Sequence, residues 1–338
     1  NNATITLNNT NAFAGAVTIT TNDDSGTDAD VILNNGTTAL ILAASTIDGD
    51  LTLTSGHASG ITDSGTVTVG GNLVATTNDN SGVINLRTLA VDGTVALTTN
   101  GSGNATVVND AGLNLAASTV RGNLAATATT GNITDSGNLA VTGTSSLTTS
   151  ANNATITLNN TNAFAGAVTI TTNDDSGTDA DVILNNGTTA LILAASTIDG
   201  DLTLTSGHAS GITDSGTVTV GGKLVATTND NSGVINLDSL AVDAGIHLRT
   251  HGTGDATAVN DAGFGFGVGG STVGGNLIAT ATTGNMWDYG SLTVGRTTTL
   301  TTSANNATIT LNNTNAFAGA VTITTNDDSG TDADVILN

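Results

Sequence analysis

Short segments in which apolar and polar residues alternate recur along the whole chain. Residues 17–20, 51–54 and 66–69 read VTIT, LTLT and TVTV, so that each aliphatic residue is followed or preceded by threonine. Alternation with a period of two places the aliphatic side chains on one face of a β-strand and the threonines on the other. The pattern therefore predicts many short strands, each with one buried face.

A long repeat contains these strands. The segment NNATITLNNTNAFAGAVTITTNDDSGTDADVILN begins at Asn1, Asn152 and Asn305, and its 34 residues are the same each time. The first offset is 151 residues and the second is 153, because NDAGLNLAASTVRG in the first block becomes NDAGFGFGVGGSTVGG in the second. We expect one continuous solenoid without linkers, with a first block at 1–151, a second at 152–304 and the start of a third at 305–338.

A shorter repeat divides each block. Recurrent apolar residues lie 22 to 29 residues apart, which predicts six coils in a block of about 151 residues. These residues are Phe13, Leu42, Val69, Val91, Leu115, Val141 and Phe164. Repeats of this length are typical of solenoids and propellers, but a propeller blade needs four strands and about 40 residues. The spacing therefore favours an all-β parallel β-helix (β-solenoid), in which stacked coils share one core.

The composition supports an all-β chain and excludes several partners. Threonine and valine favour strands, asparagine, aspartate and glycine favour turns, and the sequence holds no glutamate or glutamine for helix surfaces. The net charge is -23 and only 5 residues are lysine or arginine. Nucleic-acid binding requires cationic side chains, so we expect no nucleic-acid partner. No apolar run is long enough for a membrane helix, so we also expect no membrane insertion.

The segment NITDSGNLAVTGTSSLTTSANNATITLNN (132–160) resembles the repeats of filamentous haemagglutinin-like exoproteins and related β-strand-repeat adhesins of bacteria. The resemblance rests on the style of the repeat and extends along the whole chain. It implies a right-handed parallel β-helix at the bacterial cell surface, outside the cell. It also implies a role in adhesion, biofilm matrix or fibre formation. Open strand edges without a polar capping segment predict self-association into a filament or continuation in a longer chain. We also expect host or matrix glycans as partners.

The sequence predicts a structural or adhesive fibre segment without catalysis. Glycosidases need paired carboxylates, and polysaccharide lyases need a cation beside a carboxylate. The five cationic residues are scattered, and Asp238 stands in the second block where the first has Arg87. The alternative function is a carbohydrate-binding or polysaccharide-processing β-helix protein.

The acidic segment NDDSGTDAD supplies a candidate calcium site formed by Asp23, Asp24, Asp28 and Asp30. Calcium prefers six to eight oxygen ligands, which clustered carboxylates can provide. The spacing differs from that of an EF-hand, and no glutamate is present to act as a bidentate ligand. Solvated turn carboxylates therefore remain the alternative interpretation, and no other cofactor is expected.

The segment MWDY stands in the second block where the first has ITDS, and it supplies a candidate carbohydrate site at Trp287 and Tyr289. Aromatic rings offer an apolar surface with a polar tip, which suits stacking against a sugar. A core that widened around Phe264 and Phe266 would explain the same substitution.

Two other motifs have structural interpretations. The G-x-G-x-x-G match at Gly265, Gly267 and Gly270 is followed by a β-like segment, whereas a dinucleotide site needs a helix there. We therefore expect Phe264 and Phe266 to fill the core beside these glycines. The histidines have no zinc-ligand spacing, and we expect all four in surface loops. They are His57, His208, His247 and His251.

Overall fold

The computed structural model describes residues 3–22, 29–173, 180–326 and 333–338. The chain divides into two compact units, Asn1–Gly166 and Ala167–Asn338, called here the first and second units. Both units are built from parallel strands, and no helix occurs among the described residues. The fold is an all-β parallel β-solenoid of about 14 turns, with repeats about 22 residues apart. Accordingly, the described residues include no helix that could span a membrane.

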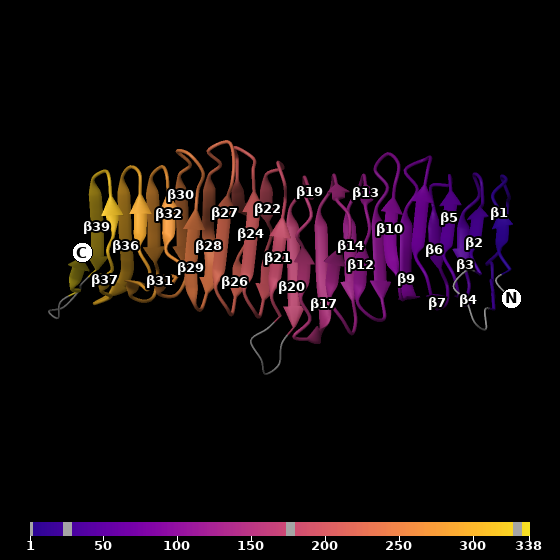
Figure 1. Ribbon diagram of the computed structural model, residues 1–338, viewed down its shortest axis with the longest axis horizontal. Helices are drawn as coiled ribbons and strands as arrows, with labels where there is room; N and C mark the ends of the chain where they lie inside the picture. Colours follow the sequence, from indigo (N-terminus) through magenta and orange to yellow (C-terminus); the bar gives the residue numbers. More distant parts are fainter. Residues whose placement is uncertain (1–2, 23–28, 174–179, 327–332) are drawn as a thin grey trace. The chain divides into compact units, whose positions relative to one another are not determined.

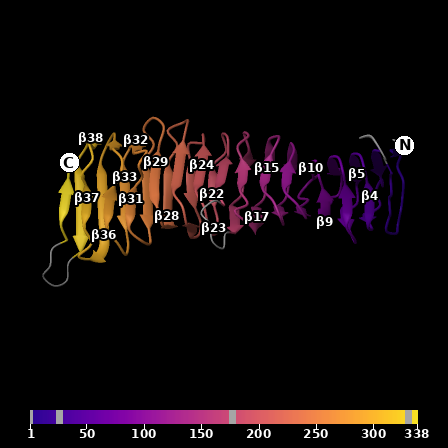
Figure 2. The same ribbon diagram turned by 60° about the horizontal axis from the view of Figure 1, so that its bottom comes forward.

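In the first unit, strands of successive turns lie side by side and form two sheets, called here sheet A and sheet B (Figures 1 and 2). Sheet A of this unit contains β1 (Ile5–Leu7), β2 (Val31–Asn34), β5 (Leu51–Ser55), β8 (Leu73–Thr77), β10 (Thr94–Thr98), β12 (Leu113–Leu115), β13 (Ser118–Val120), β15 (Ile133–Asp135), β16 (Leu139–Val141), β18 (Ile156–Leu158) and β19 (Ala163–Phe164). Sheet B contains β3 (Leu40–Leu42), β4 (Ser45–Ile47), β6 (Ile61–Asp63), β7 (Val67–Val69), β9 (Ile84–Val91), β11 (Ala105–Asn109), β14 (Leu124–Ala128) and β17 (Ser145–Asn152).

The second unit also has two parallel sheets, which carry the same names. Its sheet A contains β21 (Val182–Asn185), β24 (Leu202–Ser206), β27 (Leu224–Thr228), β29 (Gly245–Arg249), β31 (Phe264–Phe266), β32 (Ser271–Val273), β34 (Met286–Asp288), β35 (Leu292–Val294), β37 (Ile309–Leu311), β38 (Ala316–Phe317) and β40 (Val335–Leu337). Its sheet B contains β20 (Val168–Asn173), β22 (Leu191–Leu193), β23 (Ser196–Ile198), β25 (Ile212–Asp214), β26 (Val218–Val220), β28 (Ile235–Val242), β30 (Ala256–Asn260), β33 (Leu277–Ala281), β36 (Thr298–Asn305) and β39 (Val321–Asn326).

Most turns combine one straight strand in one sheet with a bent pair of short strands in the other. In the first unit the bent pairs begin in sheet B, as β3–β4 and β6–β7, and continue in sheet A from β12–β13 onward. Buried serines stabilise the bends: Ser45 Oγ accepts the Ile19 N–H at 3.0 Å, and Ser118 Oγ accepts the Leu97 N–H at 3.0 Å. A serine hydroxyl thus replaces the backbone acceptor that the bend removes from the ladder.

The parallel β-solenoid predicted from the sequence is confirmed, but each block spans seven turns and not the expected six. Seven successive pairings lead from β1 through β2, β5, β8, β10, β12 and β15 to β18, which repeats the sequence of β1. The apolar markers did not show which sheet each belongs to. Val91 lies in sheet B and Leu115 in sheet A, so that spacing covers one and a half turns. The spacing from Phe13 to Leu42 also covers one and a half turns, because Leu42 pairs with Val17 and not with Phe13.

The alternating residues form the core as predicted. Leu51, Leu53, Val67 and Val69 are fully buried, while the threonines between them are partly exposed. Burying one such aliphatic side chain contributes about 1.5–3 kcal/mol. Each turn is narrow, so the core grows along the stack by adding similar residues from turn to turn.

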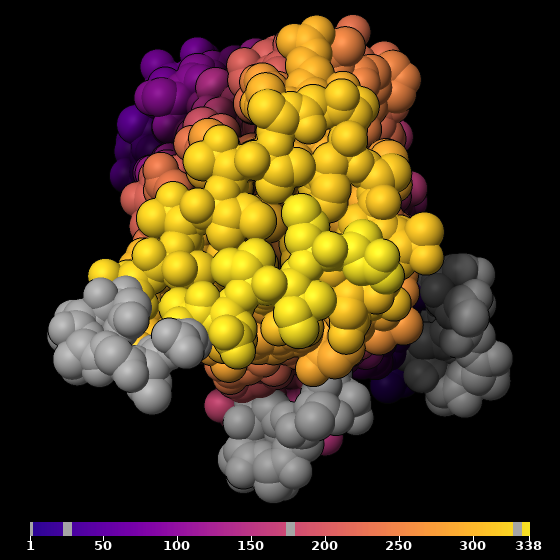
Figure 3. All heavy atoms as spheres, turned by 90° about the vertical axis from the view of Figure 1, so that its left-hand side faces the viewer, coloured from indigo at the N-terminus to yellow at the C-terminus, as the bar shows by residue number. Residues whose placement is uncertain are grey.

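Burial in this fold depends on having a neighbouring turn on each side. Val31 and Val335 begin the same sequence, VILN, yet Val31 is 1% exposed and Val335 is 43% exposed. Val31 pairs with turns on both sides, through β1 and β5. Figure 3 looks onto the C-terminal turn of the second unit, whose yellow atoms face the viewer. The same residues are therefore core or surface according to what stacks on them.

Candidate functional site

A groove opens on sheet A of the second unit, over strands β29, β31 and β34. Its volume is about 440 Å³, within the range of about 300–1,000 Å³ that is typical of small-ligand sites. We call it the aromatic groove. It is lined by Lys223, Asp243, Ala244, Gly245, His247, Gly267, Val268, Trp287 and Tyr289.

Glycines form the floor of the aromatic groove. Phe264 and Phe266 point into the core and are fully buried, so the alternation of β31 turns Gly265 outward. Gly265 pairs with Trp287 on the next turn, and a Cβ built on Gly265 would lie 2.7 Å from the indole Nε1. A Cβ on Gly263 would lie 2.6 Å from the indole Cζ3. Only glycine at these two positions therefore lets the indole lie over the strand.

Two aromatic side chains form one wall of the groove. The ring centroids of Trp287 and Tyr289 are 6.1 Å apart with an interplanar angle of 76°, an edge-to-face arrangement that aromatic pairs favour. Trp287 is half-buried, and its Nε1 is buried without a hydrogen-bond partner. Tyr289 is 59% exposed. The sequence-predicted pair is therefore brought together at a cavity, with accessible ring surface.

His247 closes another side of the groove. It lies in strand β29 over Gly267, where a Cβ would overlap the imidazole, and the side chain is buried. His247 Nδ1 lies 3.3 Å from the carbonyl oxygen of Gly270. Burial lowers the pKa of His247, and the nearby charges of Arg249 and Lys223 lower it further, against the opposing effects of the Gly270 hydrogen bond and the Asp201 charge. The expectation that His247 lies in a surface loop is wrong, because its flanking residues alternate into the core.

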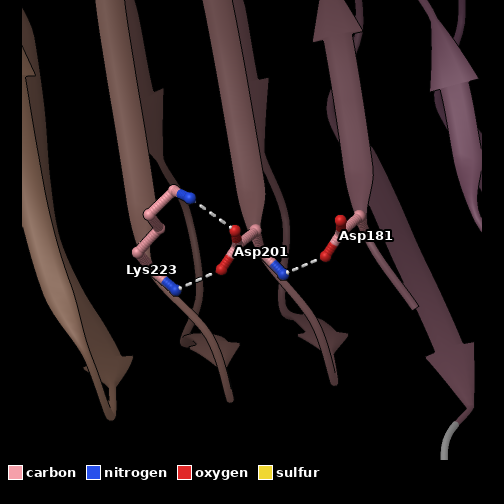
Figure 4. Close-up of polar contacts among 3 residues, drawn as sticks. All are labelled: Asp181, Asp201 and Lys223. Atoms are coloured by element: carbon pink, nitrogen blue, oxygen red, sulfur yellow. Dashed lines mark hydrogen bonds and ion pairs between the residues drawn. The ribbon is translucent and has the colours of Figure 1, made fainter. Parts of the chain in front are cut away.

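Lys223 borders the groove and is held by a carboxylate from the preceding turn (Figure 4). Lys223 Nζ lies 2.7 Å from Asp201 Oδ2, and the Lys223 backbone N–H donates to Asp201 Oδ1 at 2.8 Å. Burial raises the pKa of Asp201, but its hydrogen bonds and ion pair with Lys223 outweigh burial and hold that pKa below its ordinary value. The hydrogen bond and charge of Asp201 raise the pKa of Lys223 in turn.

This contact belongs to a ladder of corner side chains. Asp181 Oδ1 accepts the Asp201 N–H at 2.7 Å, one turn before the Asp201–Lys223 contact (Figure 4). In the first unit Asp30 Oδ1 accepts the Asp50 N–H at 2.8 Å, and Asp50 Oδ1 accepts the Asn72 N–H at 2.6 Å. These carboxylates serve as acceptors for backbone N–H groups that the corner removes from the sheets.

The first unit has a groove at the equivalent place, but without aromatic residues. Its volume is about 340 Å³, and Asp92, Asn114 and Thr134 are among the residues that line it. Asn114 pairs with Thr134 as Gly265 pairs with Trp287. At these equivalent positions the second block therefore has Gly265 in place of Asn114 and Trp287 in place of Thr134.

The candidate calcium site falls mostly outside the described residues. Asp23, Asp24 and Asp28 lie there, while Asp30 is described and accepts the Asp50 N–H. No group of three or more histidines or carboxylates lies close enough to hold a metal ion in the part of the chain that the structure describes. Calcium binding by the four aspartates therefore remains a prediction.

The interpretation of the G-x-G-x-x-G match as a core-filling segment is confirmed. Phe264 and Phe266 are fully buried with ring centroids 4.9 Å apart, and the glycines lead into strand β32. The loop prediction is confirmed for the three histidines other than His247, which lie outside the strands.

His247→Ala is expected to make stability less dependent on pH. The pKa of His247 is lowered in the folded protein, so the unfolded chain takes up a proton first as the pH falls below about 6.5. The stability associated with neutral His247 is therefore present above that pH and is lost as the pH falls toward the folded pKa. Alanine is the residue of the first block at this position, Ala96, so the variant should fold.

Urea midpoints measured at about pH 7.5 and pH 5 test this expectation. The midpoint of the parent protein should fall more than that of His247→Ala between the two conditions. The other three histidines are present in both proteins, so their contribution cancels. An equal fall of the urea midpoint in the two proteins would show that His247 does not cause the pH dependence of stability.

Comparison with known families identifies the repeat. A family model described as "Repeats of unknown function (DUF5649)" matches residues 28–98, 102–171, 179–245 and 253–324, which together make up most of the chain. No curated protein and no solved structure matches the chain.

Proposed function

The chain belongs to the family of repeats of unknown function (DUF5649), and on that basis we propose that it is a non-catalytic structural segment of a long extracellular bacterial fibre or surface adhesin. A β-solenoid made of such repeats is compatible with a structural role. We propose in addition that the chain is adhesive and lies outside the cell.

The observation that carries the proposal is the repeated register between turns. Val31 pairs with Leu51, Leu51 with Leu73, and Leu73 with Val95, in each case as part of a parallel strand pair. A turn that presents the same backbone pattern as its neighbours can be stacked repeatedly, so length is gained by adding blocks. Near-identical blocks in the sequence are what such growth produces.

Surface charge fits a long fibre segment. The net charge of -23 favours solubility and opposes lateral clumping of long assemblies. Corner carboxylates such as Asp30 and Asp50 also accept backbone N–H groups, so part of this charge is fixed to the turns. Self-association into filaments, or continuation in a longer chain, fits a solenoid in which a turn buries its apolar residues between two neighbouring turns.

Labelling of intact cells of the bacterium that produces this chain tests the proposed location. An antiserum against this chain should label unpermeabilised cells, and protease added outside should remove the signal. A cytosolic protein of the same cells serves as the control and should stay protected. A chain that is labelled only after the cells are opened would contradict the proposal.

A further inference from the structure

The aromatic groove differs from its equivalent in the first unit in a way that core packing does not explain. The core beneath it is filled by Phe264 and Phe266, which are fully buried. Trp287 and Tyr289 lie on the outer side of sheet A and stand where the first block has threonine and serine. A purely structural turn needs no aromatic residue here, since Thr134 and Ser136 occupy these places in the first unit. Aromatic side chains that line a cavity are typical of small-ligand sites.

The charges around the groove restrict the ligand. Asp243 contributes an exposed carboxylate, and Lys223 already forms an ion pair with Asp201 at 2.7 Å. His247 is buried with a lowered pKa, so it is neutral at physiological pH. Among its described lining residues the groove therefore offers no unpaired cation to an anionic ligand. Arg249 is exposed and its charge acts on His247, but it is not one of the lining residues, and the net charge of the chain opposes anions. A ligand that fits these groups is uncharged.

The shape and chemistry of the groove favour a sugar over a peptide. A pyranose has an apolar C–H face that can lie against the Trp287 and Tyr289 rings, and hydroxyl groups that can donate to Asp243. A flexible peptide would have to be ordered on binding, and a groove of about 440 Å³ contacts too few of its residues to offset that cost.

We propose that the aromatic groove is a binding site for a neutral saccharide, with one or two sugar rings seated against Trp287 and Tyr289 and hydroxyl groups hydrogen-bonded to Asp243. Tyr289 supplies the more exposed ring surface, Trp287 supplies the wall, and the glycines of β31 hold the indole in place. The proposal goes beyond the structural role, because a fibre segment could serve that role without any ligand.

The sequence contains one tryptophan, so tryptophan fluorescence reports on this groove alone. The full chain is titrated with maltose, cellobiose, lactose and chitobiose, with digalacturonate as an anionic probe and an uncharged apolar tripeptide as a peptide probe. At least one neutral disaccharide should produce a saturable change in emission with a Kd of about 1 mM or tighter. Digalacturonate and the tripeptide should produce none.

Variants taken from the first block test the residues. Tyr289→Ser keeps the reporter and should weaken sugar binding at least about tenfold, which corresponds to about 1.4 kcal/mol. Trp287→Thr should abolish binding measured by calorimetry. Ile278→Ala is the matched control, because Ile278 is an exposed apolar residue on sheet B where the first block has Ala125. The sugar affinity of this variant should equal that of the parent protein.

Three results would overturn the proposal. They are no response to any neutral disaccharide, an equal or better response to digalacturonate or the tripeptide, and undiminished binding by Tyr289→Ser. Far-ultraviolet circular dichroism of each variant shows whether the solenoid is intact. Because Thr134 and Ser136 occupy the equivalent places in the first unit, these variants should fold.

Discussion

The Phe266→Ala variant is expected to lose about 3–5 kcal/mol of unfolding free energy. Phe266 is fully buried, and its ring lies against that of Phe264 with centroids 4.9 Å apart and planes tilted by 49°. Truncation to alanine would leave a cavity that neighbouring turns cannot close, because backbone pairing with Ile246 and Asp288 fixes their spacing. The loss therefore combines the transfer term of the ring with the cavity term.

Phe266→Leu is the matched control and is expected to cost less than about 1.5 kcal/mol. Leucine occupies this position in the first unit, where Leu115 is fully buried. Urea unfolding followed by the fluorescence of Trp287 reports the turn next to the substitution, and circular dichroism reports the rest of the chain. Both signals are needed because repeat proteins can lose cooperativity between distant turns. Similar midpoints for the alanine and leucine variants would show that the ring does not act through core filling.

The fold could be predicted from the sequence because its two determinants are local. Alternation of aliphatic residues and threonine, as at Leu51 and Leu53, shows the face that is buried, and the repeat length shows that the faces stack. The turns are shorter than the sequence predicts, and a block contains seven of them where six are expected. The reason is that Val91 and Leu115 look alike in the sequence but lie in different sheets. An apolar pattern shows that a strand is buried, but it does not show which sheet the strand joins.

The site was only partly predictable, because it depends on register between turns. Trp287 and Tyr289 stood out as rare residue types, but their setting did not. The outward Gly265 acquires meaning only from its pairing with Trp287, 22 residues later. The differences between the blocks hold a usable signal. Gly245, Gly265 and Trp287 replace Thr94, Asn114 and Thr134 of the first block, and the strand register aligns them from turn to turn. His247 lies two residues from Gly245 on the same outward face of β29.

Buried asparagines also escaped prediction, since asparagine is usual in exposed turns. Asn260 is fully buried at the end of β30. Its Oδ1 accepts the Val242 N–H at 2.8 Å, and its Nδ2 donates to the carbonyl oxygens of Val242 at 2.9 Å and Gly263 at 2.7 Å. Asn109 makes the corresponding three contacts in the first unit. One side chain thus pairs three backbone groups at a corner where the sheets cannot.

Asn260→Ala is therefore expected to cost about 2–4 kcal/mol, since each buried backbone group left without a partner costs about 1–3 kcal/mol and water can reach some of them after the change. Asn285→Ala is the matched control. Asn285 is exposed, and its Oδ1 accepts one backbone N–H, that of Thr308, at 2.9 Å. Water can replace that acceptor, so the expected cost is below about 1 kcal/mol. Urea midpoints measured through Trp287 fluorescence compare the two variants with the parent. A smaller loss for Asn260→Ala than for Asn285→Ala would mean that the corner is held by its backbone geometry and that the buried amide contributes little.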